Sequence, residues 1–209
     1  MLKLLGRQTS GNVQKVVFAL EEMGAPYIRE DYGRDFGNTT TEAYAKLNPT
    51  RKVPTLVDGG TVVWESNTIL RYLAAAYAPA LSGATPAERS EVEPWMDWLL
   101  ASVNAAFLGV FRETKKKPEE RGPEFIAASN DLVSQLRILD GHLAECQFIA
   151  LGRFTIADAA LAPIIKRCVG FPIDRPAFPG IEGWLGRIEA RPAFQVAIGA
   201  KTSAVNTAA

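Results

Sequence analysis

The chain has 209 residues, of which 47% are hydrophobic and 22% charged, and both fractions are typical of a folded globular protein. Its 23 basic and 23 acidic residues cancel, so it lacks the basic excess that binds nucleic acids or anionic membranes. The N-terminal segment turns polar too soon for a signal peptide, and no apolar run is long enough to cross a bilayer. We therefore expect a cytoplasmic protein without nucleic-acid or membrane partners. One histidine and two separated cysteines make a metal site improbable.

The first part of the chain predicts alternating strands and helices. A short apolar strand precedes the polar loop RQTSGN at residues 7–12, and apolar residues then recur at helical spacing up to Met23. Gly24 is a natural end for that helix, and the next strand should pair in parallel with the first. The predicted elements are a strand at 3–5, a helix at 13–23, a strand at 27–32, a short helix that the TTTE run at 39–42 caps and that ends near Leu47, a hairpin at 54–64 and a helix from Ser66 to about Tyr77. This βαβαββα order is the thioredoxin-like arrangement.

The run NPTRKVPTLVDGGTVVWESNT, residues 48–68, carries the strongest functional signal. Two strand-like runs flank an Asp-Gly-Gly turn, which predicts the hairpin. Pro54 cannot donate to the ladder, and with a cis peptide bond it would leave the Val53 backbone free to pair with an extended, peptide-like ligand. Ser66, interpreted as the N-cap of the next helix, suits a carboxylate, and Glu65 could hold an ammonium group beside it.

These groups together would bind an α-amino acid end and an extended backbone. The alternative is that Pro54 only starts an edge strand and Ser66 only caps a helix, and each feature alone favours that interpretation. The combination at this spacing favours a binding site.

Beyond residue 78 the chain predicts a linker and then only helices. Residues 78–86 hold two prolines, a glycine and small residues, and Thr85 begins a capping box with proline at the first helical position. Thr155 and Asp158 have the same spacing, and their cap is expected to stabilise the fold. An apolar stripe at helical spacing follows Thr85 and ends near Phe111. Further helices are predicted over residues 125–143, from Thr155 to Ile165, over residues 181–188 and from Pro192. A frayed tail is expected from Thr202.

VPTLVDGG followed by WES resembles the glutathione-binding signature of the cytosolic glutathione transferase family. In that family the valine backbone pairs with the cysteinyl unit of glutathione, while the acidic residue and the serine hold its γ-glutamyl end. FTIAD, residues 154–158, resembles the N-capping segment of a buried helix in the same family. The resemblance covers nearly the whole chain. It implies a thioredoxin-like domain at 1–78, a linker at 79–86, an all-helical domain at 87–209, glutathione as co-substrate, a homodimer and a role in detoxification.

Thr9, Ser10 and Asn12 lie in the loop that leads into the first helix. A thiolate is favoured by a hydrogen-bond donor at a helix N-terminus, so this loop is where the catalytic donor should lie. Ser10 resembles the catalytic serine of the serine-type classes, and the TSGN run resembles the loop of bacterial members in which threonine and asparagine share the work. The tyrosine and cysteine of other classes have no counterpart here. The alternatives left open are that Ser10 is only a helix cap and that Asn12 is the residue that contacts the sulfur.

Other residues carry weaker signals. Of Arg51 and Lys52, Lys52 is preferred for the glycyl carboxylate of glutathione. An apolar second-substrate pocket is expected from Phe107, Phe111 and Arg112, and the histidine, His142, is expected at the surface.

The leading functional hypothesis is a glutathione S-transferase that conjugates the thiolate to small hydrophobic electrophiles. The same site could instead serve a glutathione-dependent disulfide reductase, peroxidase, dehalogenase or isomerase. A non-catalytic interaction module with this fold is the third possibility, against which the retained site residues argue.

Overall fold

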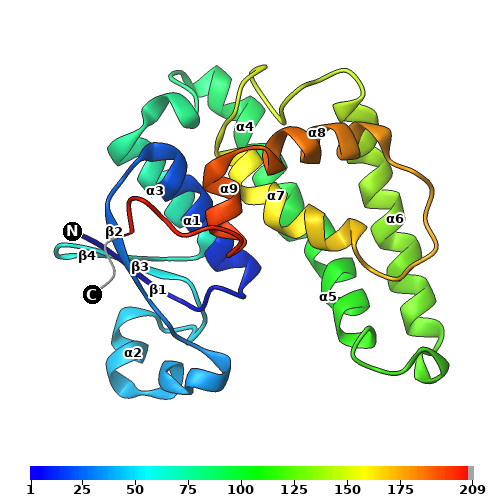
Figure 1. Cartoon of the computed structure of the whole chain (residues 1–209), viewed down its shortest axis with the longest axis horizontal. Helices are drawn as coiled ribbons and strands as arrows, with labels where there is room; N and C mark the ends of the chain where they lie inside the picture. The colour runs from blue at the N-terminus through cyan, green and yellow to red at the C-terminus, as the bar shows by residue number, and fades with distance from the viewer. Residues whose placement is uncertain (207–209) are drawn as a thin grey trace.

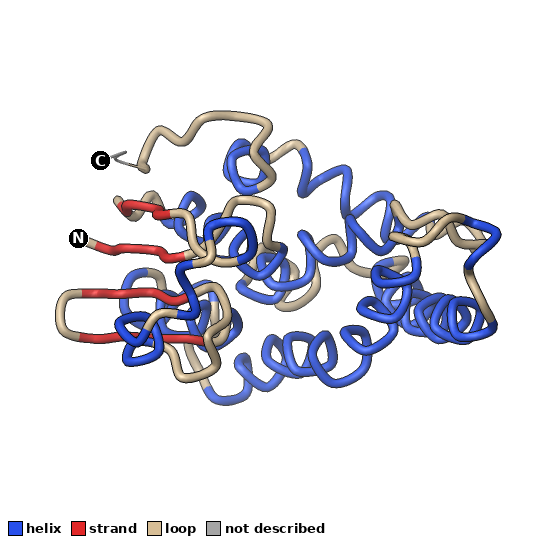
Figure 2. Tube along the Cα trace, turned by 90° about the horizontal axis from the view of Figure 1, so that it is seen from below, coloured by secondary structure: helices blue, strands red, loops and turns tan. Residues whose placement is uncertain are grey.

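A computed structural model describes residues 1–206, with a four-stranded sheet at one end of the molecule and helices at the other (Figures 1 and 2). The strands are β1 (Leu2–Leu5), β2 (Tyr27–Glu30), β3 (Thr55–Asp58) and β4 (Thr61–Trp64), in the order β2-β1-β3-β4. β1 is parallel to β2 and antiparallel to β3, and β3 and β4 form the predicted hairpin. The hairpin turns through Gly59, whose φ of 55° is one that glycine adopts readily.

Helices cover both faces of this sheet. α1 (Gly11–Met23) and α3 (Ser66–Tyr77) pack against each other on one face, and α2 (Glu42–Leu47) lies on the other (Figure 1). The apolar spacing in α1 buries Val13, Val16, Val17 and Leu20 completely or nearly so. The predicted thioredoxin-like domain is confirmed, including the left-handed Gly24 that ends α1.

The second half is helical, as predicted. Its helices are α4 (Pro86–Trp98), α5 (Asn104–Glu113), α6 (Pro123–Leu143), α7 (Ile156–Val169), α8 (Pro179–Glu189) and α9 (Pro192–Ala197). A π-helical turn at Leu99–Val103 joins α4 to α5, a feature that the apolar stripe did not indicate. α7 is buried along most of its length and contacts α1, α3 and α4, so it joins the helices to the sheet layer. The division into domains at residues 79–86 remains our proposal.

The capping box that opens α7 is present and extends beyond the cap. Asp158 is fully buried, and its carboxylate accepts hydrogen bonds from the Thr155 N–H at 2.9 Å and the Ile149 N–H at 3.1 Å. It also accepts one from the Trp184 indole of α8 at 2.9 Å. Burial raises the pKa of Asp158, and the donated hydrogen bonds oppose that rise. Asp158 therefore ties three segments of the helical half together.

Two predictions need correction, one about the start of α3 and one about the C-terminal tail. Ser66 is the first residue of α3 rather than its N-cap; that position belongs to Glu65, whose φ is 67°. The tail is not frayed at residues 202–206, because the Ser203 hydroxyl bonds the Glu21 carboxylate and Asn206 forms a β-bridge with Tyr27. Residues 207–209 lie outside the described part of the chain. Among the described helices, none combines the length and apolarity that a membrane span requires.

Candidate active site

Three cavities that share lining residues form one groove; two of them lie between the sheet layer and the helical half, and the other is lined by residues 7–53 alone. Their volumes are about 280, 160 and 150 Å³, and Asn12 lines all three. The first holds Ser10, Lys52 and Val53; the second holds Thr9 and Ser10; the third holds Lys52, Val53, Pro54, Glu65 and Ser66. The groove thus brings together every site residue predicted from the sequence.

The Val53-Pro54 segment forms the floor of the groove. Its peptide bond is cis. The preceding carbonyl, that of Lys52, accepts hydrogen bonds from the Tyr44 hydroxyl at 2.6 Å and the Asn48 amide at 2.9 Å. Thr55 completes this network through contacts with the same two side chains. Within residues 1–206, no hydrogen bond engages the backbone N–H or C=O of Val53, so both are available to an extended ligand.

Glu65 and Ser66 lie at the start of α3. The Ser66 hydroxyl, which is buried, donates to the side-chain oxygen of Asn12 at 3.3 Å, while Glu65 is exposed in the groove. Lys15 follows Asn12 by one helical turn and is only 1% exposed. Burial lowers the pKa of Lys15 to about 7, and the negative charge of Glu65 opposes that fall. Among residues 1–206 the Glu65 carboxylate forms no ion pair, and the first N–H groups of α3 lack helical partners, so this end of the groove suits an α-amino acid end.

Ser10 occupies the N-cap position of α1, but its hydroxyl makes no capping hydrogen bond. Its carbonyl receives the Gln14 N–H at 2.9 Å, so the backbone is engaged while the hydroxyl faces the groove. The Ser10 side chain therefore does not cap α1 by a hydrogen bond, and its catalytic role stays a prediction. A hydroxyl here, at the positive end of α1, can donate to a thiolate.

Asn12 and Thr9 flank Ser10 on different sides. Asn12 uses its side-chain oxygen to receive Ser66, which leaves its amide N–H groups for a ligand. Thr9 is exposed and lines only the 160 Å³ cavity among the three, on the side away from Glu65. Ser10 and Asn12 therefore both remain candidates for the contact with sulfur.

Two family models match most of the chain. Residues 9–76 match the model of the glutathione S-transferase N-terminal domain, and residues 103–192 match that of the C-terminal domain. The chain is 34% identical over 200 residues to glutathione S-transferase GstB of Escherichia coli strain K12, an alignment that covers 93% of this chain and 96% of GstB. The chain belongs to the glutathione S-transferase family.

Other relatives agree with this assignment. The chain is 30% identical to glutathione S-transferase 3 of Zea mays, with 95% of this chain and 94% of the maize protein covered. A theta class glutathione S-transferase from Xanthomonas axonopodis pv. citri, solved with glutathione bound, superposes with a TM-score of 0.89 at 39% identity and covers 95% of this chain and 97% of its own. The predictions of the family and of a glutathione transferase with glutathione as co-substrate are confirmed.

The second-substrate side of this transferase differs from the predicted one. Phe107 and Phe111 line the 160 Å³ cavity, with ring centroids 5.9 Å apart, but Arg112 does not line it. In the neighbouring cavity, Arg51 is held by Glu42 at 2.9 Å and by the Thr40 carbonyl at 2.6 Å. Lys52 has no ion pair within residues 1–206, which supports its preference over Arg51 as an anion ligand.

Sequence reasoning missed several residues of the transferase groove. Arg7 and Arg34 line two of its cavities, Asn104 lines two, and Arg167 of α7 lines one. Arg7 lies in the same polar loop as Ser10, which was the available signal. Arg167 gave none, because it reaches the groove only through the packing of α7 against α1.

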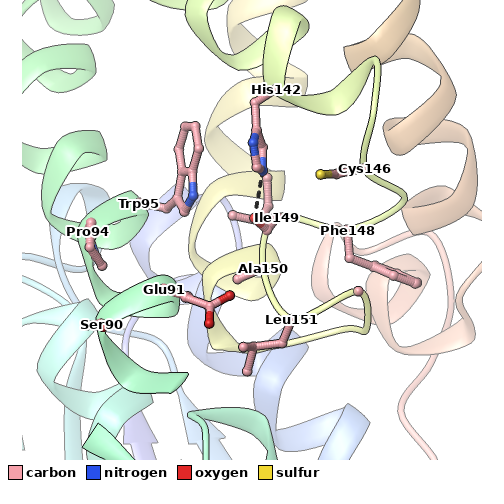
Figure 3. Close-up of a pocket in the computed structure, with 11 residues that line it drawn as sticks. Ser90, Glu91, Pro94, Trp95, His142, Cys146, Phe148, Ile149, Ala150 and Leu151 are labelled. Carbon is pink, nitrogen blue, oxygen red and sulfur yellow. Dashed lines mark hydrogen bonds between the residues drawn. The ribbon is translucent and has the colours of Figure 1, made fainter. Parts of the chain in front are cut away.

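A larger cavity of the transferase, of about 640 Å³, lies away from this groove. Trp95 of α4, His142 of α6 and Cys146 line it (Figure 3). His142 is half-buried rather than at the surface: its ring centroid is 4.4 Å from that of Trp95, and its Nε2 contacts the Ile149 carbonyl at 2.8 Å. None of the predicted site residues lines this cavity, so it is separate from the glutathione groove.

Proposed function

We propose that this protein conjugates the glutathione thiolate to small electrophiles, with Ser10 donating a hydrogen bond to the sulfur. The free Ser10 hydroxyl, facing the groove beside the unpaired Val53 backbone, is the observation that carries the proposal. The thiol of a cysteine has an ordinary pKa of about 8.5, so little thiolate exists at neutral pH without help. A donor at the N-terminus of α1 would lower that pKa and hold the nucleophile in place.

The remaining groups would orient glutathione along the groove. Val53 would pair with the cysteinyl backbone, Glu65 and Ser66 would hold the γ-glutamyl end, and Lys52 would face the glycyl carboxylate. Asn12 would stand beside the sulfur, linked to Ser66. The attack forms a carbon–sulfur bond, the leaving group departs with its electron pair, and the thiol proton goes to solvent.

Conjugation is favoured over a thiol–disulfide mechanism that uses an enzyme cysteine. Cys168 is buried, and burial raises the pKa of its thiol, while Cys146 lines the separate cavity near His142. Neither thiol lines the groove that Ser10 faces. The nucleophile is then the bound glutathione itself.

Side-by-side assays test this function. We expect turnover of a chlorinated nitroaromatic, and slower or no turnover of a hydroperoxide and of a mixed disulfide. Faster turnover of the peroxide or disulfide would replace conjugation by the redox alternative. Failure to be retained on immobilised glutathione, together with no activity in any assay, would favour the non-catalytic module.

We also propose that two copies of the chain pair. The proposal is supported by β4, an edge strand whose Val62 and Trp64 are 37% and 39% exposed, and by Leu100, 42% exposed beside Glu65 in the groove. Apolar residues on an edge strand need a cover to prevent aggregation. Light scattering after size exclusion should give twice the mass of 22.7 kDa, and Trp64→Glu should shift the protein toward the monomer. A wild-type monomer at all concentrations would contradict the pairing.

A cytoplasmic location and a detoxifying role are further proposals that follow from the family. Cell fractionation tests the first, and the sensitivity of a deletion strain to a toxic electrophile tests the second.

A further inference from the structure

The 160 Å³ cavity next to Ser10 is lined by two chemically different sets of side chains. One set is apolar and comes from the helical half, with Phe107, Leu108, Phe111 and Ile164. The other set is a cluster of three arginines, Arg7, Arg34 and Arg167. An apolar pocket for neutral electrophiles would not require three cations beside the thiolate position.

Arg7 is half-buried, and its charge is unpaired. Its Nε is shielded from water and has no hydrogen-bond partner, and no ion pair engages it within residues 1–206. The guanidinium lies over Gly33, where even a Cβ would come within 3.0 Å of its Nη1. Gly33 therefore makes room for Arg7, whose side-chain N–H groups have no hydrogen-bond acceptor among residues 1–206.

Arg167 is fixed in place from the opposite side. Its Nη2 donates to the Thr9 carbonyl at 3.0 Å and to the Gln14 side-chain oxygen at 2.8 Å. In the described part of the chain its Nε and Nη1 have no hydrogen-bond partner, so two donor groups remain for a ligand. The guanidinium is thus held rigidly beside the loop that carries Ser10.

The local electrostatics favour an anion. Burial and the charge of Arg34 lower the pKa of both Arg7 and Arg167, and the two also repel each other, yet arginines stay ionised at neutral pH. The negative charge of Asp35 partly opposes the fall in the pKa of Arg7, but Asp35 is exposed and does not line the cavity. No carboxylate among residues 1–206 forms an ion pair with any of the three arginines. Such a cluster is stabilised when a carboxylate binds it.

Glutathione accounts for only part of this cluster. Its glycyl carboxylate is assigned to the 280 Å³ cavity, where Arg7, Arg34, Arg51 and Lys52 supply positive charge. Arg167 does not line that cavity; it lines the 160 Å³ cavity with Phe107 and Phe111. Arg167 therefore faces the second substrate alone, and Arg7 lines both cavities.

We propose that the preferred second substrates are small electrophiles that carry a carboxylate next to the reactive carbon, a class that includes the α-halocarboxylates. Arg7 and Arg167 bind the carboxylate and aim the reactive carbon at the sulfur. The thiolate forms a carbon–sulfur bond, the carbon–halogen bond breaks, and halide leaves with the electron pair. This inference rests on the proposed conjugating function and narrows its substrate class.

Chloroacetate and chloroacetamide form a matched pair of probes, because they differ in charge but hardly in size. For each we would measure the S-alkylated glutathione formed, and divide kcat/KM by the uncatalysed rate constant. We expect this ratio to be about tenfold or more higher for chloroacetate, in line with a charge-assisted contact. An equal or lower ratio for chloroacetate would overturn the inference.

Arg7→Met and Arg167→Met identify the residues responsible. We expect each to lower kcat/KM for chloroacetate by about tenfold or more, with kcat/KM for chloroacetamide changed by less than about threefold. For Arg167→Met, whose side chain does not line the glycyl cavity, the KM for glutathione should also change by less than about threefold. Arg137→Met on the exposed face of α6 is the matched control. Equal losses for both probes, or a rise in the KM for glutathione alone, would assign the arginines to structure or to glutathione and overturn the inference. Absence of turnover with every electrophile would instead remove the proposed function itself.

Discussion

The Ser66 hydroxyl donates to the Asn12 side-chain oxygen at 3.3 Å and so joins the first turns of α3 and α1. The two helices approach the groove from different parts of the fold, one with the amino-acid end of the predicted glutathione site and the other with the thiol end. Fixing their first turns to each other fixes the distance between these two ends. The geometry of the groove therefore depends on both residues, even if only one contacts the sulfur.

Replacing Ser10 by alanine tests the proposed donor. Ser10→Ala should raise the pKa of bound glutathione and lower kcat by about tenfold to a hundredfold, because one hydrogen bond to a charged sulfur is lost. The KM for glutathione should change little. The pH dependence of the thiolate ultraviolet absorbance and of kcat would measure both effects.

Two further variants complete that test. Ser134→Ala, on an exposed face of α6, is the control for loss of a serine hydroxyl. Full activity of Ser10→Ala together with loss of activity in Asn12→Ala would move the catalytic assignment to Asn12.

Lys52→Met examines the glycyl end of the groove. Because Lys52 has no ion pair in the described chain, we expect its loss to raise the KM for glutathione about threefold to tenfold, with kcat nearly unchanged. The increase should shrink in high salt, since the ammonium is exposed. Lys46→Met on α2, also exposed, should leave the KM unchanged. A normal KM for glutathione in Lys52→Met at low salt would indicate that Arg34 and Arg51 bind the glycyl carboxylate instead.

Lys15 should make the stability of the protein depend on pH. Its pKa is about 7 in the folded chain, against an ordinary value of 10.5, so between these values the unfolded chain binds the additional proton. The free energy of unfolding should therefore rise as pH increases from about 7 to about 10.5, by at most about 1.4 kcal/mol per pH unit from this group.

Lys15→Met removes this dependence. The variant should be more stable than the wild type at pH 6, by a few kcal/mol at most, and the difference should shrink as pH rises from about 7 to 10. Urea unfolding at several pH values measures it, with Lys46→Met as the exposed control. A constant difference across this range would show that Lys15 is solvated or fully neutralised by Glu65 in the folded protein.

The local features of the fold could be predicted from the sequence because short-range chemistry determines them. The Asp-Gly-Gly turn, the Gly24 helix end and the Thr85 and Thr155 capping boxes each depend on a few neighbouring residues. The error at Ser66 has a local cause too: Glu65 takes a positive φ that side chains rarely adopt, and the helix begins one residue earlier than a serine cap would place it.

The cluster of Arg7, Arg34 and Arg167 could not be predicted in the same way. Arg167 bonds the Thr9 carbonyl from 158 residues further along the chain, and only the packing of α7 on α1 brings them together. Periodicity showed that Phe107 and Phe111 share one face of a helix, but not which side chains would line the same cavity. The groove for glutathione was therefore visible in one short run of sequence, whereas the second-substrate side was not.

Removing Asp158 should cost more stability than the loss of a helix cap alone. Asp158→Ala would leave the buried N–H groups of Thr155, Ile149 and Trp184 without an acceptor. Each unsatisfied donor costs about 1–3 kcal/mol, so we expect a loss of about 3 kcal/mol or more and a fall in Tm of about 6 °C or more. Differential scanning calorimetry measures the change, and Asp131→Ala, on an exposed face of α6, should shift Tm far less. Below its melting range the Asp158 variant should keep its KM for glutathione, because the residue lies outside the groove; an unchanged melting curve would contradict its role in stability.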